Sequence, residues 1–404
     1  MRFSKKLLCA GTLLTLLTVT GCKGVLDVFE YVKAPEAPSI TSQPKNIMYF
    51  SNYIIEPPKI FKEKISKVKG IYVTSTHAGI DKYLQKHIDF CVGSGVNAMV
   101  IDVRTEAGFI TFQGMPTADE LGVSVNDISD IKEVLIRIKE NGIYPIARMV
   151  AFKDNNTYNF KPELYIKNPD GSIWFDNNDE AWLNPYNSKA RDYVLQFAEE
   201  AVELGFEEIQ FDYMRFAASS KLENADMGKT NGLTRTEIIT VFAKEAMETL
   251  GPMGAKISAD VYGAIINSDT DAEIVGQDYV ELARLLDVIC PMIYPSHYAN
   301  GSMGLDIPDL LPYDTIYKSM KLSNERLDEI PNGEHRAIVR PWLQDFTASW
   351  LNSYLEYAGD ERGAQIQGAY DAGLSEWLLW DPWNKYEMDG INGNARFANI
   401  NMDE

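Results

Sequence analysis

The sequence is poor in cysteine and histidine, with four residues of each type in 404. No Cys/His spacing is typical of a zinc site, and so few scattered histidines argue against a histidine-rich metal centre. Beyond the first 22 residues, only Cys91 and Cys290 remain, both in apolar stretches. They could pair if the fold brought them together, and buried free thiols are an equally good interpretation. The sequence therefore demands no metal or other cofactor, although its carboxylate-rich loops could bind calcium.

Positive charge is also scarce. The chain has 38 lysines and arginines against 58 aspartates and glutamates, which gives a formal net charge of −20. A protein that binds nucleic acid needs a basic surface to neutralise phosphates, so nucleic acid is not expected as a partner. The same acidity disfavours a polyanionic substrate unless arginines cluster locally in a site.

Long apolar runs are absent after the N-terminus. Residues 7–19 form an apolar run that follows a basic segment and is too short to span a bilayer comfortably. The next residues, Val19-Thr20-Gly21-Cys22, resemble the lipobox of bacterial lipoproteins, in which the cysteine is acylated. We therefore expect residues 1–21 to be a lipoprotein signal peptide, whose removal would change the charge to −23. Cys22 would then carry a lipid anchor that holds the protein on the bacterial cell envelope, facing outward.

Residues 22–67 are expected to be a tether between this anchor and the folded domain. They contain five prolines among scattered polar residues and show no sustained hydrophobic period. Such a segment cannot bury enough apolar surface to order itself. The folded domain is expected to occupy residues 68–404.

In this domain, short apolar runs alternate with amphipathic helical patterns. The expected strands cover residues 70–73, 97–103, 144–150, 206–212, 256–261, 286–294, 337–342 and 377–380. Helices are expected between them, among others at 81–92, 128–139, 190–204, 234–251 and 346–357. Eight such units predict an α/β fold, a (β/α)₈ TIM barrel with inserted βα loops. A doubly wound open sheet is the alternative, but no glycine-rich phosphate loop follows any of the strands.

The segment from Phe206 to Phe216 reads as the fourth strand of this barrel. Strand alternation places Ile209 and Phe211 on one face and Glu208, Gln210 and Asp212 on the other. The interior of a parallel barrel can accommodate so many polar groups, because the strand ends open there into a pocket. The segment is therefore expected to deliver Asp212 to an active site.

Polar and aromatic side chains collect at the ends of the other strands as well. Active sites of barrel enzymes are built at the carboxyl ends of the strands. The residues predicted to bind substrate there are Asp102, Arg104, Arg148, Tyr213, Arg215, Tyr262, Tyr294, His297, Arg340, Trp342, Trp380 and Asp381. Any one of them could have a structural role, for example Asp102 as a buried partner of Arg104 or Arg148.

Asp212 and Asp260 form a pair of carboxylates at the ends of adjacent strands. Hydrolysis of a glycosidic bond needs one acid to protonate the leaving oxygen and one carboxylate to attack the sugar. Adjacent strands lie about 5 Å apart, which fits the roughly 5–5.5 Å between the carboxylates of retaining glycosidases. We assign Asp212 as the nucleophile, kept ionised by Arg215 or another arginine, and Asp260 as the general acid/base, kept protonated by a drier aromatic setting.

Aromatic residues are frequent in the insertion after the third strand, where they alternate with Asn and Asp. They are Phe152, Tyr158, Phe160, Tyr165, Trp174, Phe175, Trp182 and Tyr186. Sugar rings stack on aromatic faces while polar groups bind their hydroxyls. A flap that packs on itself is an equally good interpretation of any one of these residues.

Several segments resemble a bacterial family labelled "putative glycoside hydrolase", which is distantly similar to α-amylase-like barrels. The resemblance covers about residues 65–385 and is most specific in the segments Glu208-Ile209-Gln210-Phe211-Asp212-Tyr213-Met214-Arg215-Phe216 and Met292-Ile293-Tyr294-Pro295-Ser296-His297-Tyr298. It implies a TIM barrel with glycosidase activity. It also implies that Asp212, after the fourth strand, is the nucleophile. Amylase-like relatives have a Glu as the acid after the fifth strand, where this chain has Asp260.

These observations predict a cell-surface, retaining glycoside hydrolase that acts with an Asp/Asp pair on a polysaccharide or exopolysaccharide, which could be α-linked. A non-catalytic glycan-binding protein on the same scaffold is the main alternative, because it would keep the aromatic residues and lose only turnover. A deacetylase is a third reading, disfavoured by the lack of a His/Asp metal cluster. The expected partners are an oligo- or polysaccharide substrate and the membrane that holds the lipid anchor.

Overall fold

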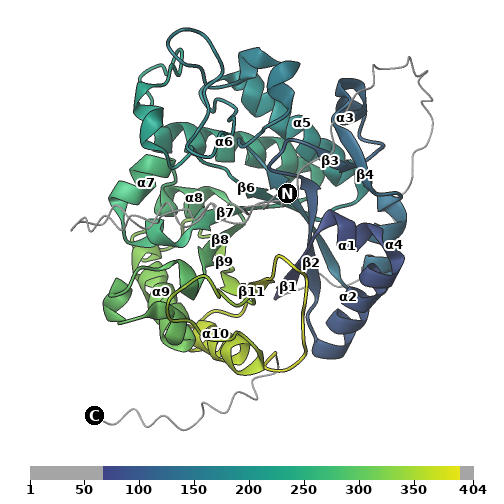
Figure 1. Ribbon diagram of the computed structural model, residues 1–404, viewed down its shortest axis with the longest axis vertical. Helices are drawn as coiled ribbons and strands as arrows, with labels where there is room; N and C mark the ends of the chain where they lie inside the picture. The colour runs from purple at the N-terminus through teal and green to yellow at the C-terminus, as the bar shows by residue number, and fades with distance from the viewer. Residues whose placement is uncertain (1–66, 392–404) are drawn as a thin grey trace, which may run out of the picture.

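The computed structural model describes residues 67–391, which fold into a closed barrel of parallel strands surrounded by helices (Figure 1). The barrel strands, in the order in which they neighbour one another, are β1 (Lys69–Val73), β2 (Ala98–Arg104), β5 (Tyr144–Val150), β6 (Glu208–Asp212), β7 (Lys256–Tyr262), β8 (Val288–Ile293), β10 (Trp342–Gln344) and β11 (Trp377–Trp380). The last strand pairs with the first, Gly70 lying opposite Leu378, so the sheet closes on itself. The predicted (β/α)₈ barrel is confirmed.

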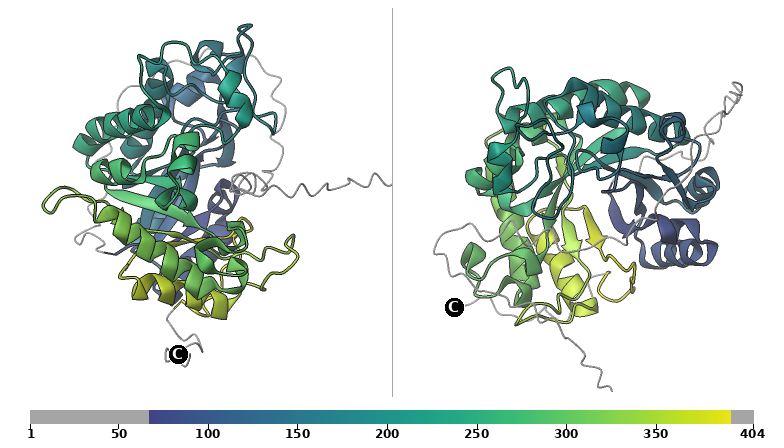
Figure 2. Two further views of the ribbon diagram at one scale, coloured as in Figure 1. Left: turned by 90° about the vertical axis from the view of Figure 1, so that its left-hand side faces the viewer. Right: turned by 45° about the horizontal axis from the view of Figure 1, so that its top comes forward.

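The helices form the outer layer, as two further views also show (Figure 2). They are α1 (Ser75–Gly79), α2 (Asp81–Ser94), α3 (Pro116–Leu121), α4 (Ile131–Glu140), α5 (Ser188–Leu204), α6 (Arg235–Leu250), α7 (Asp269–Val275), α8 (Tyr279–Leu285), α9 (Pro312–Leu327) and α10 (Gly359–Asp371). Short 3₁₀ turns connect several of them. Within the described residues, none of these helices combines the length and the apolar character needed to cross a bilayer.

Local sequence signals explain where the helices begin and end. A capping box opens α6: the Thr234 hydroxyl accepts the Glu237 N–H, and the Glu237 carboxylate accepts the Thr234 N–H. Gly205 ends α5 in the left-handed region with φ 112°, a conformation that glycine adopts without steric cost.

Strand alternation divides the core into two layers. Side chains such as Ile71, Ile209 and Phe211 point outward and pack under the helices. The opposite faces fill the barrel interior, where Val100, Ile146, Cys290, Trp342 and Leu378 form a second apolar cluster. Cys91 lies on α2 in the outer layer, whereas Cys290 lies in the barrel interior. Both are buried, free thiols.

Two insertions enlarge the barrel. After β2, the chain adds β3 (Ile110–Phe112), antiparallel to β2, and β4 (Ser124–Ile128), which pairs with β3. After β5, residues 151–187 form a long loop whose few bridges include Lys153 with Trp182 and Phe175 with Ala181.

Two predicted elements within the domain differ from the structure. Residues 346–357 form turns, and the next helix, α10, begins only at Gly359. The helical spacing of Phe346 and Trp350 instead reflects two rings that stack on each other, with centroids 5.9 Å apart. The seventh strand is divided into β9 (Ile338–Val339), which pairs only with β8, and β10. The signal peptide, Cys22 and the tether, apart from Lys67, lie outside the described residues.

Candidate active site

Strand β6 carries Asp212 to the carboxyl end of the barrel. Its register against β5 sets Val150 opposite Asp212, and its register against β7 sets Phe211 opposite Ala259. One residue further along this register, Asp212 and Asp260 are neighbours on the inner faces of β6 and β7. Both are buried, with 8% and 3% of their surfaces exposed. The sequence-predicted pair is therefore brought together at the barrel mouth.

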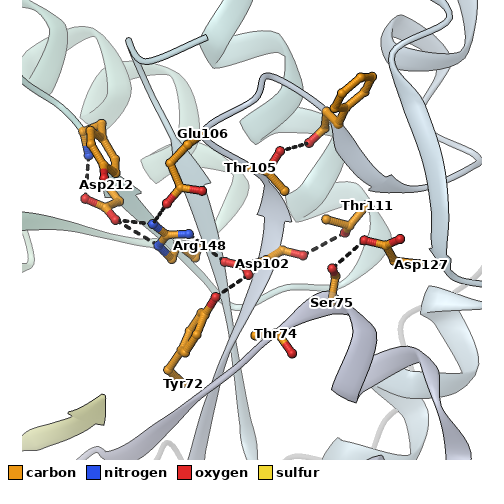
Figure 3. Close-up of polar contacts among 12 residues, drawn as sticks. Tyr72, Thr74, Ser75, Asp102, Thr105, Glu106, Thr111, Asp127, Arg148 and Asp212 are labelled. Carbon is orange, nitrogen blue, oxygen red and sulfur yellow. Dashed lines mark hydrogen bonds and ion pairs between the residues drawn. The ribbon is translucent and has the colours of Figure 1, made fainter. Parts of the chain in front are cut away.

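Arg148 on β5 binds three carboxylates, of which Asp212 is one (Figure 3). Its Nε donates to Asp212 over 2.9 Å, one Nη donates to Asp102 over 2.7 Å, and the other Nη donates to Asp212 and Glu106. Burial opposes the charge on this guanidinium, but the three acids outweigh it and raise the pKa of Arg148. Arg148, rather than Arg215, is the arginine that binds Asp212.

Two of these acids respond differently to the same guanidinium. Burial raises the pKa of Asp102, although Arg148 partly offsets the rise. Burial alone would also raise the pKa of Glu106, but Arg148 and Lys153 outweigh it and lower that pKa. Tyr72 completes the cluster by donating its hydroxyl to Asp102 over 2.5 Å. The cluster thus fixes the position of the Asp212 carboxylate.

Asp260 lies in a different environment from Asp212. Burial and the neighbouring Asp212 charge raise the pKa of Asp260 well above its usual value. The Trp342 indole N–H donates to its Oδ1 over 2.7 Å and opposes part of this rise. The pair thus combines a carboxylate that is ion-paired with Arg148 and a carboxyl group whose pKa is raised, an arrangement suited to acid catalysis with a carboxylate partner.

Aromatic rings surround this pair. Trp380 stacks on Tyr72 with centroids 4.0 Å apart, and Tyr294 contacts Phe346 edge-on at 5.9 Å. Burial and the charges of Asp260 and Asp212 raise the pKa of Tyr294 well above its usual value. Trp350 stacks on Phe346 and keeps about half of its surface exposed, 52%. The mouth therefore combines apolar walls with a few fixed polar groups, as carbohydrate sites do.

Comparison with known families identifies the domain. Residues 70–386 match the family described as "Putative glycosyl hydrolase domain". The chain belongs to this family. Its hydrolase domain accordingly carries the Asp pair, Arg148 and the aromatic walls at the place where barrel enzymes act.

Solved structures support the fold assignment. The glycoside hydrolase domain of PgaB (BpsB) from Bordetella bronchiseptica aligns with a TM-score of 0.57 at 10% identity, over 82% of this chain and 96% of that one. An α-galactosidase from Thermus thermophilus, TtGalA, aligns with a TM-score of 0.50 at 14% identity, over 81% of this chain and 60% of that one. At such identities the likeness shows the TIM-barrel fold alone.

A hypothetical protein from Ruminiclostridium thermocellum is more similar in sequence. It is 36% identical over 47% of this chain and 97% of its own length, with a TM-score of 0.44. A search of curated proteins found no match to this chain.

Arg104 does not reach the active site of the hydrolase domain, so its predicted role in substrate binding is wrong. A β-bulge shifts the register between Asp102 and Arg104, and the arginine consequently points away from the barrel interior. It is fully buried in an ion pair with Asp154, and its guanidinium lies over the Tyr193 and Phe197 rings of α5. Its role is to brace α5 and the insertion.

Arg340 is sealed inside the barrel, so its predicted role in substrate binding is also wrong. It precedes Trp342 by two residues on the same inner face and therefore lies one layer deeper. Its guanidinium binds Glu376 over 2.8 Å and Glu208 over 2.7 Å, with no exposed surface. Ser258 donates a further hydrogen bond to Glu208. This group is the floor beneath the Asp212–Asp260 pair.

The remaining predicted residues lie around the mouth with separate tasks. The Asp381 carboxylate accepts the backbone N–H groups of Trp383 and Lys385, and so shapes the loop that presents Trp383. His297 contacts Ser296 through its Nδ1, and burial lowers the pKa of His297 to about 4. The rings of Tyr213 and Tyr262 lie against the Arg215 guanidinium.

Most aromatic residues of the 151–187 insertion form a self-packing flap. Phe152, Tyr165, Trp174 and Trp182 are buried, and the Trp182 indole donates to Asp176. Phe160, 59% exposed, and Phe175, 36% exposed, are the exceptions.

Sequence reasoning missed three residues of the site: Tyr72, Glu106 and Trp350. Tyr72 lies at an inward position of an otherwise aliphatic strand, and this pattern could have indicated that its side chain belongs to the site. Glu106 follows β2 in a loop, where alternation no longer predicts direction. Within the described residues, no group of three or more His, Cys, Asp or Glu side chains is arranged to hold a metal ion.

Proposed function

We propose that the protein is a retaining glycoside hydrolase that cleaves a polysaccharide or exopolysaccharide, with Asp212 as nucleophile and Asp260 as general acid/base. The observation that carries the proposal is the contrast between two adjacent carboxyl groups. Asp212 is ion-paired with Arg148, whereas burial and its neighbour raise the pKa of Asp260. Membership of the hydrolase family supports the reaction class.

In this mechanism a sugar unit binds between the Trp380 and Tyr294 walls, with its anomeric carbon at the Asp212 carboxylate. Asp260 gives its proton to the departing glycosidic oxygen while Asp212 forms a covalent bond to the sugar. Asp260, now ionised, then removes a proton from water, which attacks the anomeric carbon and releases Asp212. An anchor at Cys22 would hold this activity at the outer face of the cell envelope.

The test is release of reducing ends from a panel of polysaccharides and aryl glycosides. Asp212→Asn and Asp260→Asn should each lower kcat by about 10²-fold or more, because each removes a group that acts in the transition state. Asp192→Asn, a change of the same kind at an exposed position of α5, should leave kcat unchanged. Circular dichroism must show that all three variants stay folded.

The outcomes separate the two readings of the sequence. Hydrolysis that survives in Asp212→Asn would remove this residue from the mechanism. An absence of hydrolysis, combined with equal glycan binding by the wild type and both Asp→Asn variants, would favour the non-catalytic binding protein. Retention would be checked by NMR of the first anomer formed, and an inverted product would contradict the double-displacement route.

A further inference from the structure

Arg215 is a buried positive charge that lacks a carboxylate partner in the part of the chain that the structure describes. Only 4% of its surface is exposed, and one Nη donates to the Phe216 carbonyl over 2.9 Å. The neighbouring cations differ: Arg148 pairs with three acids, and Lys153 pairs with Glu180. A buried charge is usually paired, because removing it from water is costly.

Three aromatic rings hold the Arg215 guanidinium in place. The ring centroids of Tyr262, Tyr213 and Trp182 lie 4.5, 4.8 and 5.1 Å from its central carbon. Ring faces attract the cation but offer no acceptor for its in-plane N–H groups. The Nε and the second Nη have no hydrogen-bond partner among residues 67–391, yet they are not sealed from solvent. Two donors are therefore fixed in direction and still open to a ligand.

The position of Arg215 relative to Asp212 is set by Tyr213. Tyr213 has φ 49°, a left-handed conformation that is uncommon for a bulky residue and is kept where the surroundings enforce it. Its N–H donates to the Asp212 carboxylate over 2.6 Å, and its ring lies 4.8 Å from both Lys153 and Arg215. A single side chain thus separates the proposed nucleophile from the unpaired guanidinium.

We propose that Arg215 binds an anionic group of the substrate, so that the hydrolase acts on a glycan whose units carry carboxylates or sulfate esters. This inference rests on the proposed function. A guanidinium binds either group through two parallel N–H···O hydrogen bonds, which the fixed, open edge of Arg215 provides. The net charge of −20 disfavours polyanions in general. Recognition therefore depends on this local cation, while Arg148 and Lys153 are already neutralised.

The first experiment compares matched aryl glycosides. It measures kcat/KM for an aryl uronide and for the corresponding neutral aryl hexoside, at low and high NaCl. The wild type should prefer the uronide by about tenfold or more, mainly through a lower KM, as a charge-assisted bidentate contact implies. This preference should weaken as salt is added.

Variants of Arg215 then assign the preference. Arg215→Gln should bring the uronide-to-hexoside ratio close to one. Arg215→Lys keeps the charge without the two-pronged geometry and should retain part of the preference, which keeps the test decisive if Arg215→Gln does not fold. Arg336→Gln removes a surface arginine that pairs with Asp328 and should leave the ratio unchanged. An unaltered ratio in both Arg215 variants, or a wild type that prefers the hexoside, would overturn the inference.

Binding measurements separate this inference from the proposed hydrolysis. Calorimetry would measure binding of polyuronate, sulfated and neutral oligosaccharides to the wild type and to Arg215→Lys. Arg215-dependent binding of an anionic oligosaccharide without any turnover would support the subsite and count against hydrolysis. Turnover of neutral glycans, together with no Arg215-dependent binding, would support hydrolysis and refute the subsite. The stronger of the polyuronate and sulfated ligands identifies the anionic group.

Discussion

Arg148 is the single side chain on which the site geometry most depends. It connects β5 to acids from β2, β6 and the loop after β2, and it lies 5.6 Å from the Trp380 ring. A planar guanidinium can hold three carboxylates at fixed angles, whereas the rounder ammonium group of lysine cannot. In the proposed mechanism, proton transfer depends on Asp260 and its direct neighbours.

The Asp260–Trp342 hydrogen bond gives a prediction about pH. The acid must be protonated, so kcat/KM should be high below the pKa of Asp260 and fall as pH rises through it. The Trp342 N–H stabilises the ionised carboxylate and thereby lowers that pKa. Trp342→Phe should therefore raise the pKa and move the alkaline limb of the pH–rate profile to higher pH.

The control for this prediction is Trp377→Phe. The Trp377 indole donates to the Tyr370 hydroxyl and makes no contact with Asp260, so its loss should not move the limb. A limb that stays in place in Trp342→Phe, or moves to lower pH, would show that Asp260 is not the group that titrates.

At the level of strands and helices, the ion-paired group beneath the site ties together β6, the segment between β9 and β10, and the residue that precedes β11. Arg340, Glu208 and Glu376 are all buried there. Arg340→Met would leave two buried carboxylates without their partner. We expect the free energy of unfolding, measured in urea, to fall by about 3–5 kcal/mol.

A combined variant distinguishes lost pairing from lost volume. Glu208→Gln and Glu376→Gln, added to Arg340→Met, remove the stranded charges and should recover most of the lost stability. No recovery would mean that packing, and not charge, dominates this position.

The strands also show which features of the fold and the site could be predicted from the sequence. Alternation along the strands was sufficient to predict the barrel and to place Asp212, Asp260 and Arg148 at one end, because the carboxyl ends of parallel strands necessarily converge. It failed at Arg104, since a bulge adds a residue on one strand only and the sequence gives no sign of the register change.

Long-range pairing was also beyond the sequence. It could not tell that Arg148 rather than Arg215 binds Asp212, since that choice depends on side-chain directions across two strands. Nor could it distinguish a helical stripe in residues 346–357 from two rings that stack at the barrel mouth. Periodicity reports which faces are apolar but not what they pack against.

For the molecule as a whole, the reactivity of the two free thiols measures how well the two core layers exclude reagents dissolved in water. Cys91 and Cys290 are buried in different layers, and burial raises the pKa of both thiols. In a Cys9→Ser/Cys22→Ser variant, Ellman's reagent should label neither thiol in the folded protein and both after unfolding in urea. Fast labelling of the native protein, or no labelling after unfolding, would contradict this arrangement.

The pairing of β11 with β1 also has a consequence for biosynthesis. The strand that completes the ring ends at Trp380, and its partner begins at Lys69. A ribosome must therefore synthesise more than three hundred residues between the two before the ring can close. Until then β1 and β10 each present an open edge, the feature through which nascent sheets aggregate. Release of a prematurely terminated chain that lacks β11 should thus yield a species that chaperones retain, not a slightly shortened enzyme.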